Sequence, residues 1–268
     1  MSRLGATQIS ARKDAAFPVV TAYDTPFARC AEAAGIDVLL CGDSLGQVVL
    51  GYSSTLPVEL VDMVRHAAAV IRGTERAHVI VDLPFGTYAA SDDLAVTSAS
   101  ELIKRSGASS VKLEGGAAAA PRIRAIVDAE IPVCAHIGVL PQTAALGSGF
   151  RRKREREQLL RDAHAIAEAG AFAVVLEMVD EEIAAAITAQ IAIPTIGIGS
   201  GSHCDGQVLV LHDVLGLYPE SPPFAKQYAQ LGDLATDALR AYALDVRSRT
   251  FPPVATAAGP RSGNGYRT

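Results

Sequence analysis

Acidic and ionisable residues recur where the short apolar runs of this sequence end. Six successive Val/Ile/Leu-rich runs each stop at such a residue, namely Asp24, Asp43, Asp82, Glu114, His136 and Glu177. Packing does not explain one charge at the tip of every run, because charged side chains are seldom buried without a partner. In a (β/α)8 barrel the carboxyl ends of the strands converge on one mouth, where the active site of that fold lies. The pattern therefore predicts an active site built from strand ends.

Three of these residues, Asp43, Asp82 and Glu114, end the second, third and fourth runs and would lie on adjacent strands. Carboxylates this close repel one another unless a cation lies between them. Oxygen-only ligands with positions left for water and substrate favour Mg²⁺ over Ca²⁺. The sequence thus predicts one Mg²⁺ per chain. The alternative is that one or more of the three caps a loop or pairs with Lys112.

Lys112, His136 and Glu177 complete the candidate site. Lys112 lies two residues before Glu114, so both side chains share one face of their strand. An ammonium there would hold an anionic substrate group or a developing enolate oxygen, or else serve as the structural partner of a carboxylate. His136 and Glu177 would face the metal ligands across the mouth. Glu177 leaves an apolar run and is suited to act as a general base, whereas a lone His136 can also be a core histidine.

Apolar runs alternate with Ala-rich stretches of helical period, a pattern typical of βα units around a parallel sheet. Eight strands are predicted, at 17–23, 37–42, 78–83, 110–114, 132–137, 172–178, 194–199 and 207–211. The clearest helices are predicted at 57–73, 93–107, 155–169, 180–190 and 225–248. Only GSHCDG separates the last two strands, which leaves no room for a full helix there. We therefore expect an α/β fold, a (β/α)8 TIM barrel.

The composition limits the other possibilities. A chain of 268 residues with 49% hydrophobic and 20% charged residues suits a single barrel domain with an N-terminal extension over 1–251. The tail 252–268 is poor in large apolar residues and is expected to be disordered.

Charge and cysteine content bear on partners and location. A net charge of -5 argues against binding to nucleic acid or to an anionic membrane, and no apolar run reaches the roughly 20 residues of a membrane span. The four cysteines form no Cys-x-x-Cys pair, and the first residues do not resemble a secretory leader. We expect a cytoplasmic protein that acts on small molecules.

Several stretches resemble the ketopantoate hydroxymethyltransferase family, and together they extend from about residue 19 to 251. They are VTAYD, GDSLGQVVLGYSSTLPV, DLPFGTY, GASSVKLEGG, IPVCAHIGVLPQ, AGAFAVVLE, IPTIGIGSGSHCDGQVLVLHD and PFAKQY. The resemblance implies a barrel of the phosphoenolpyruvate/pyruvate superfamily type in a large homo-oligomer, such as a decamer. It implies metal ligation by Asp43, Asp82 and Glu114. It also implies that Asp43, Ser44, Asp82, Lys112 and His136 bind the 2-oxo acid and that Glu177 is the catalytic base.

The reaction that the resemblance implies starts from 3-methyl-2-oxobutanoate, with 5,10-methylenetetrahydrofolate as cosubstrate. Chelation of Mg²⁺ by the 2-oxo acid would draw electrons from its carbonyl and acidify the neighbouring carbon-hydrogen bond. The Mg²⁺-bound enolate would then attack the one-carbon unit. The product would be ketopantoate, a precursor of pantothenate and coenzyme A.

One loop departs from the family pattern. The family usually carries Gly-Tyr-Lys-Val-Gln-Gly where this chain has GSGFRRKRE at 147–155, and Leu140 and Asp180 replace a usual Thr and Pro. The cations of this loop would hold the folate tail, or the loop is a solvated turn without ligand contact. Two rival functions remain: another Mg²⁺-dependent 2-oxo acid carbon-carbon lyase or aldolase, and a catalytically silent oligomeric paralogue.

Overall fold

The structure is a computed structural model that describes residues 3–253, apart from the side chains of Ala145 and Ser148. The chain divides into two compact units, Met1–Leu211 and His212–Thr268. The first contains all eight strands. The single domain predicted for 1–251 stays a prediction, and most of the predicted disordered tail, from residue 254 on, lies outside the described residues.

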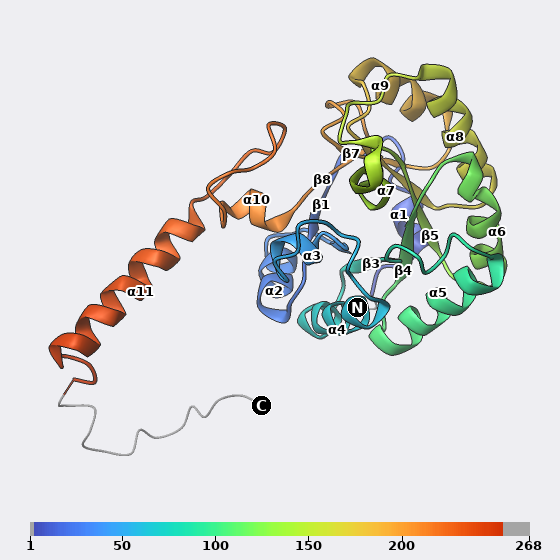
Figure 1. The fold of residues 1–268 in the computed structure, drawn as a ribbon. Helices are drawn as coiled ribbons and strands as arrows, with labels where there is room; N and C mark the ends of the chain where they lie inside the picture. The colour runs from blue at the N-terminus through green and yellow to red at the C-terminus, as the bar shows by residue number, and fades with distance from the viewer. Residues whose placement is uncertain (1–2, 254–268) are drawn as a thin grey trace. The chain divides into compact units, whose positions relative to one another are not determined.

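The first unit is a closed barrel of eight parallel strands (Figure 1). The strands are β1 (Phe17–Thr21), β2 (Val38–Cys41), β3 (His78–Asp82), β4 (Ser110–Glu114), β5 (Val133–Gly138), β6 (Ala173–Glu177), β7 (Thr195–Ile198) and β8 (Gly206–Leu209). Each strand pairs with the next, and β8 returns to β1 to close the ring. The ends of all eight strands lie within two residues of the predicted ones, so the predicted fold class is confirmed.

Helices surround the barrel. The main ones are α2 (Thr25–Ala33), α4 (Leu60–Gly73), α5 (Asp92–Ser106), α6 (Ala120–Asp128), α8 (Arg156–Glu168) and α9 (Glu181–Gln190), and each packs against the next. Helix α5 shows why they form: Ser91 accepts a hydrogen bond from Leu94 N at the start, and Gly107 ends the helix at a φ of 77°. The helices predicted near α4, α5, α8 and α9 are confirmed, and Asp180 caps α9 by accepting a hydrogen bond from Glu182 N.

Helices α2 and α6 were not predicted. Each has nine residues, with a proline in its first turn. Two and a half turns give the helical period few repeats, so the pattern is weak in sequence. Between β7 and β8 the described chain contains only a loop, as the spacing predicted.

Short elements close the two ends of the barrel. At the amino ends of the strands, α1 (Ala6–Ser10) inserts the fully buried Ile9 into the core beside Phe17 and Val38. Four short helices follow strands on the opposite side: α3 (Leu45–Val48), η1 (Ala117–Ala119), α7 (Pro141–Thr143) and η2 (Ala144–Ser148).

Strand alternation decides which side chains enter the lumen. Val38, Leu40, Ile80, Cys134 and Val175 form the interior core. Side chains two positions further along a strand lie on the same face, one layer higher. By this rule Asp82 follows Ile80, His136 follows Cys134 and Glu177 follows Val175. The polar layer therefore lies directly on top of the apolar one.

The second unit contains α10 (Leu211–Leu215), which begins at its boundary, and α11 (Leu231–Ser248). The amphipathic helix predicted at 225–248 is confirmed, with a later start. Leu234, Leu239 and Leu244 on α11 are exposed. None of the helices in residues 3–253 combines the length and apolar character that crossing a membrane requires.

Candidate active site

The closest charge pair in the barrel mouth joins β3 to β4. Strand register sets Asp82 beside Lys112, and Lys112 Nζ lies 2.7 Å from Asp82 Oδ1, with both side chains buried. Burial alone would lower the pKa of Lys112, but the neighbouring carboxylates, Asp82 foremost, raise it. Lys112 is thus a charged partner of one predicted metal ligand, which is the alternative that the sequence left open.

Asp43 lies two residues beyond β2, and its backbone N donates to Asp82 Oδ2 at 3.0 Å. The residue is only 4% exposed. Burial, followed by the negative charge of Asp82, raises the pKa of Asp43 to about 8, although Lys112 acts in the opposite direction. The negative charge of Asp82 therefore disfavours the ionised form of Asp43, which is the kind of repulsion that the sequence predicted.

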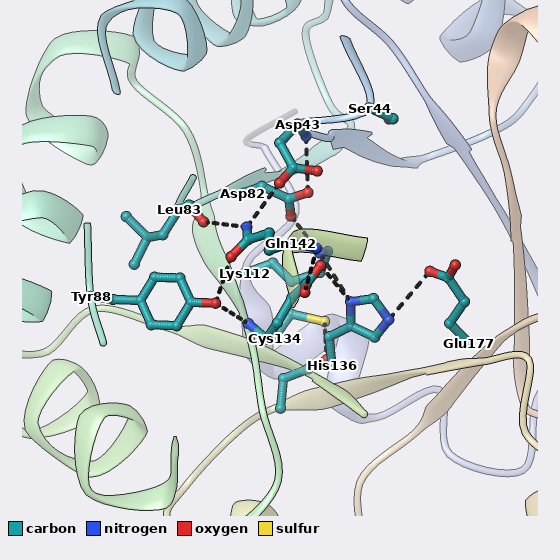
Figure 2. Close-up of polar contacts among 12 residues, drawn as sticks. Asp43, Ser44, Asp82, Leu83, Tyr88, Lys112, Cys134, His136, Gln142 and Glu177 are labelled. Carbon is teal, nitrogen blue, oxygen red and sulfur yellow. Dashed lines mark hydrogen bonds and ion pairs between the residues drawn. The ribbon is translucent and has the colours of Figure 1, made fainter. Parts of the chain in front are cut away.

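A second row of groups runs from Glu114 through His136 to Glu177 (Figure 2). His136 Nδ1 lies 3.5 Å from Glu114 Oε1, and His136 Nε2 lies 3.4 Å from Glu177 Oε2. Burial and Lys112 act to lower the pKa of His136, but its contacts with Glu114 and Glu177 raise it to about 9. His136 therefore lies between the acidic cluster and Glu177 and contacts both, rather than serving as an apolar core histidine.

The backbone holds Glu177 in place at the end of β6. Glu177 O accepts a hydrogen bond from Val139 N at 2.8 Å. This close approach needs glycine at position 138, because a Cβ there would lie 2.3 Å from Glu177 O. The next residue, Met178, has a φ of 48°, and its N donates to Ile198 O. The Glu177 side chain is 15% exposed, so it reaches the mouth while staying largely desolvated.

Two other residues named from the sequence lie differently. Ser44 Oγ lies 2.9 Å from the hydroxyl of Tyr23, and in Figure 2 its side chain points away from the carboxylates. Asp24, the first of the charged run ends, caps α2 by accepting from Phe27 N at 2.9 Å. Asp24 is thus a structural cap and does not join the site.

Sequence reasoning missed Gln142 and Tyr88. Gln142 Nε2 donates to Asp43 Oδ2 at 2.8 Å and to Leu83 O at 3.0 Å. The Tyr88 hydroxyl donates to Gln142 Oε1 at 2.7 Å. Both residues lie within the stretches that resemble the family, DLPFGTY and IPVCAHIGVLPQ, but neither ends a strand. A neutral amide outside the strands carries no charge by which a pattern search could select it.

The predicted metal ligands do not converge on one point. No cluster of at least three His, Cys, Asp or Glu side chains in residues 3–253 has a spacing that could hold an ion. Asp82 is paired with Lys112. Glu114 is directed to His136 and to Gln142 N, which donates to Glu114 Oε2 at 3.2 Å. The three-ligand set stays a prediction.

The chemistry of the cluster nevertheless fits a divalent cation. Three carboxylates, those of Asp43, Asp82 and Glu114, are buried close together beside Lys112, and their proximity disfavours the ionised form of Asp43 while no ion is bound. Within the described part of the chain, no hydrogen bond of good geometry reaches the buried atom His136 Nε2, despite its contact with Glu177. Buried polar atoms in this condition are costly unless a ligand or ion satisfies them. Oxygen donors of this kind suit Mg²⁺.

The divergent loop 147–155 is anchored beside Glu177. Lys153 N donates to Met178 O at 2.8 Å, and Asp180 N donates to Lys153 O at 2.9 Å. Arg152 Nη1 donates to Val179 O and to Gly199 O, each at 2.8 Å. Most described residues of the loop are exposed, which is compatible with both a folate-binding loop and a solvated turn. Arg152 nevertheless has defined hydrogen-bond partners.

Known proteins resemble this chain in sequence and in fold. The family described as Ketopantoate hydroxymethyltransferase matches residues 3–254. A protein of Chloroflexus aurantiacus named 3-methyl-2-oxobutanoate hydroxymethyltransferase is 54% identical over 239 residues, which is 88% of this chain and 85% of that protein.

Solved structures of other enzymes share the fold at low identity. The 2,3-dimethylmalate lyase, a member of the PEP mutase/isocitrate lyase superfamily, has a TM-score of 0.59 at 19% identity and covers 95% of this chain and 92% of its own. A phosphonopyruvate hydrolase in complex with oxalate and Mg²⁺ has a TM-score of 0.60 at 14% identity, with 96% and 93% covered. At these identities the likeness concerns the fold, whereas the sequence matches cover the strand-end residues themselves. On those matches the chain belongs to the ketopantoate hydroxymethyltransferase family.

Proposed function

We propose that this enzyme transfers a hydroxymethyl group from 5,10-methylenetetrahydrofolate to 3-methyl-2-oxobutanoate. The product would be ketopantoate, for pantothenate and coenzyme A synthesis. The observation that carries the proposal is the division of the mouth by His136, with the acidic cluster and Lys112 on one side and Glu177 on the other. A cation site and a separate base are what deprotonation next to a carbonyl requires.

Asp43, Asp82 and Glu114 would hold one Mg²⁺ per chain. When bound, the ion would draw electrons from the keto group of the substrate and acidify the hydrogen on carbon 3. The related phosphonopyruvate hydrolase was solved with Mg²⁺ and oxalate, a small diacid. We take that complex as a fold-level analogy in support of a 2-oxo acid at this mouth.

The side chains of the mouth would divide the remaining work. Glu177 takes the proton from carbon 3, and the ammonium of Lys112 stabilises the negative charge that develops on the substrate oxygen. His136 Nε2 lies 3.4 Å from Glu177 Oε2 and would orient that carboxylate. Carbon 3 then bonds to the methylene carbon of the folate. The methylene carbon gives up its bonds to both folate nitrogens, and water supplies the hydroxyl. The two nitrogens gain one proton from that water and one from Glu177, so tetrahydrofolate and ketopantoate leave and Glu177 is a carboxylate again.

The assembly and location of the enzyme belong to the same proposal. We infer a cytoplasmic homo-oligomer, supported by the family resemblance and by four cysteines that are all free thiols. Its partners would be the 2-oxo acid and the folate, together with copies of the same chain.

Proton NMR of 3-methyl-2-oxobutanoate in D2O tests the proposal in two stages. With Mg²⁺ and enzyme but no folate, the signal of the carbon 3 proton should disappear through exchange, and a chelator should stop the loss. Addition of methylenetetrahydrofolate should then give ketopantoate. Exchange without product would favour another 2-oxo acid enzyme of the same fold. Absence of both would favour a silent paralogue.

A further inference from the structure

Gln142 joins more elements of the mouth than the other uncharged residues around it. It lies in α7, after β5, and is 1% exposed. Its side-chain amide donates to Asp43 Oδ2 and to Leu83 O, and its backbone N donates to Glu114 Oε2. Figure 2 shows it between Asp43 and Tyr88. One neutral residue thus contacts two predicted metal ligands that lie on different strands.

The partners of Gln142 determine which way its amide points. Nε2 faces two oxygens that can only accept, a carboxylate and a carbonyl. Oε1 faces the Tyr88 hydroxyl, which donates to it at 2.7 Å. A rotation of the amide by half a turn would set oxygen against oxygen at both acceptors. Tyr88 itself accepts from Glu114 N at 3.3 Å, so the network returns to the acidic cluster.

We propose that Gln142 is a positioning residue that holds the carboxylate of Asp43 in the orientation needed to bind the metal ion. This inference rests on the proposed function. One oxygen of Asp43 is tied to the amide, and Figure 2 shows the other on the side of Asp82. Together with the hydrogen bond from Asp43 N to Asp82 Oδ2, this contact would keep the two aspartates side by side before any ion binds.

A neutral amide suits this role better than a cation would. Lys112 already pairs with Asp82 at 2.7 Å. A second positive charge on Asp43 would compete with a bound ion, whereas an amide hydrogen bond orients the carboxylate and leaves its charge in place. Groups that orient metal ligands in this way commonly change metal affinity by about 10–100-fold when they are removed.

Calorimetric titration of Mn²⁺ into chelator-treated protein tests the inference. Gln142→Met keeps the length of the side chain but not its hydrogen bonds, and it should weaken Mn²⁺ binding about tenfold or more. Tyr88→Phe removes only the hydroxyl that anchors Oε1 and should weaken binding about threefold, an estimate below the usual range for orienting groups. Ser106→Ala is the control for stability, because Ser106 makes buried hydrogen bonds within α5 and to Ala108. Its Mn²⁺ affinity should equal that of the unaltered protein.

The results separate positioning from a purely structural role. At saturating Mn²⁺, Gln142→Met should recover most of its carbon 3 exchange, because the base Glu177 is untouched. If Gln142→Met binds Mn²⁺ as tightly as the unaltered protein, the inference is wrong. Should that variant not fold, an unchanged affinity in Tyr88→Phe would overturn it equally. If the unaltered protein itself neither binds Mn²⁺ nor exchanges the proton, it is the proposed function that fails.

Discussion

Two buried aspartates at opposite ends of the barrel have opposite surroundings. Asp205, 8% exposed, lies before β8 at the amino ends of the strands. It accepts from Asp14 N and Thr195 N at 2.8 Å and from Lys13 Nζ at 3.1 Å. Burial acts to raise its pKa, but these hydrogen bonds together lower it. Asp43, 4% exposed at the other end, accepts from Gln142 beside two further carboxylates, and its pKa is raised to about 8.

Both residues are aspartates with little exposed surface, but Asp43 is buried more deeply and has different neighbours. Donors surround Asp205, which gives a carboxylate that stabilises the fold. Asp43 has an amide donor, Gln142, but also two anionic neighbours that disfavour its ionised form. This difference matches the usual division of the fold, in which the amino end contributes stability and the carboxyl end binds ligands.

The largest effect on activity is expected at Glu177, the proposed base that removes the substrate proton. Glu177→Gln keeps the shape of the side chain but removes the base, so carbon 3 exchange measured by NMR should fall about 10²–10⁴-fold. Calorimetry should find metal affinity and melting temperature close to those of the unaltered protein. Exchange at the original rate would assign the base to another group.

A matched pair of substitutions tests the comparison itself. Asp205→Asn leaves Lys13 and several backbone donors without their anion and should lower the free energy of unfolding by about 3 kcal/mol. Asp43→Asn removes one of three repelling anions and should leave the metal-free protein at least as stable. Denaturant unfolding without metal measures both. If both substitutions lowered the free energy of unfolding equally, the two aspartates would not differ in their contribution to stability.

A buried histidine makes the stability of the amino end depend on pH. His78 contacts Leu4 O and Ser110 Oγ, and burial lowers its pKa from 6.5 to about 4. The unfolded chain therefore gains the proton first as pH falls. This contribution to stability is complete above pH 6.5 and is lost between there and about pH 4. By pH 5 the loss should reach about 2 kcal/mol.

The measurement compares urea unfolding at pH 7.5 and pH 5 for the unaltered protein and for His78→Gln. The variant should lose less stability over this interval, since it has no group that titrates at that position. Identical losses in both proteins would show that other groups cause the acid sensitivity.

The smallest effect is expected in the divergent loop. Arg151 and Arg152 are both exposed, and Arg152 donates hydrogen bonds to Val179 O and Gly199 O. If Arg151 attracts the anionic folate tail, Arg151→Ala should raise the KM for the donor by at most about fivefold, and less at high salt. Steady-state kinetics at two salt concentrations decide this. An unchanged donor KM at both would make Arg151 part of a solvated turn.

The sequence predicted the strands well because each is a short apolar run, and the first six runs stop at an ionisable residue. It also identified Asp82, Lys112 and His136 as candidate site residues, because strand alternation and register follow directly from the pattern of apolar runs. It could not predict that Asp24 caps a helix, because a charge at a strand end has the same appearance in either role. Gln142 was beyond prediction, because its four contacts join residues 28 to 99 positions away in the chain.

The direct test of the account is the binding of a divalent ion to the carboxyl end of the barrel. Calorimetric titration of Mg²⁺ or Mn²⁺ into the chelator-treated protein should give one ion per chain. Asp43→Asn and Asp82→Asn should each weaken that binding strongly, while the proton-transfer variant Glu177→Gln should retain it. If both aspartate variants bind the ion as tightly as the unaltered protein, or if the unaltered protein binds none, the acidic cluster is not a metal site and the account is wrong.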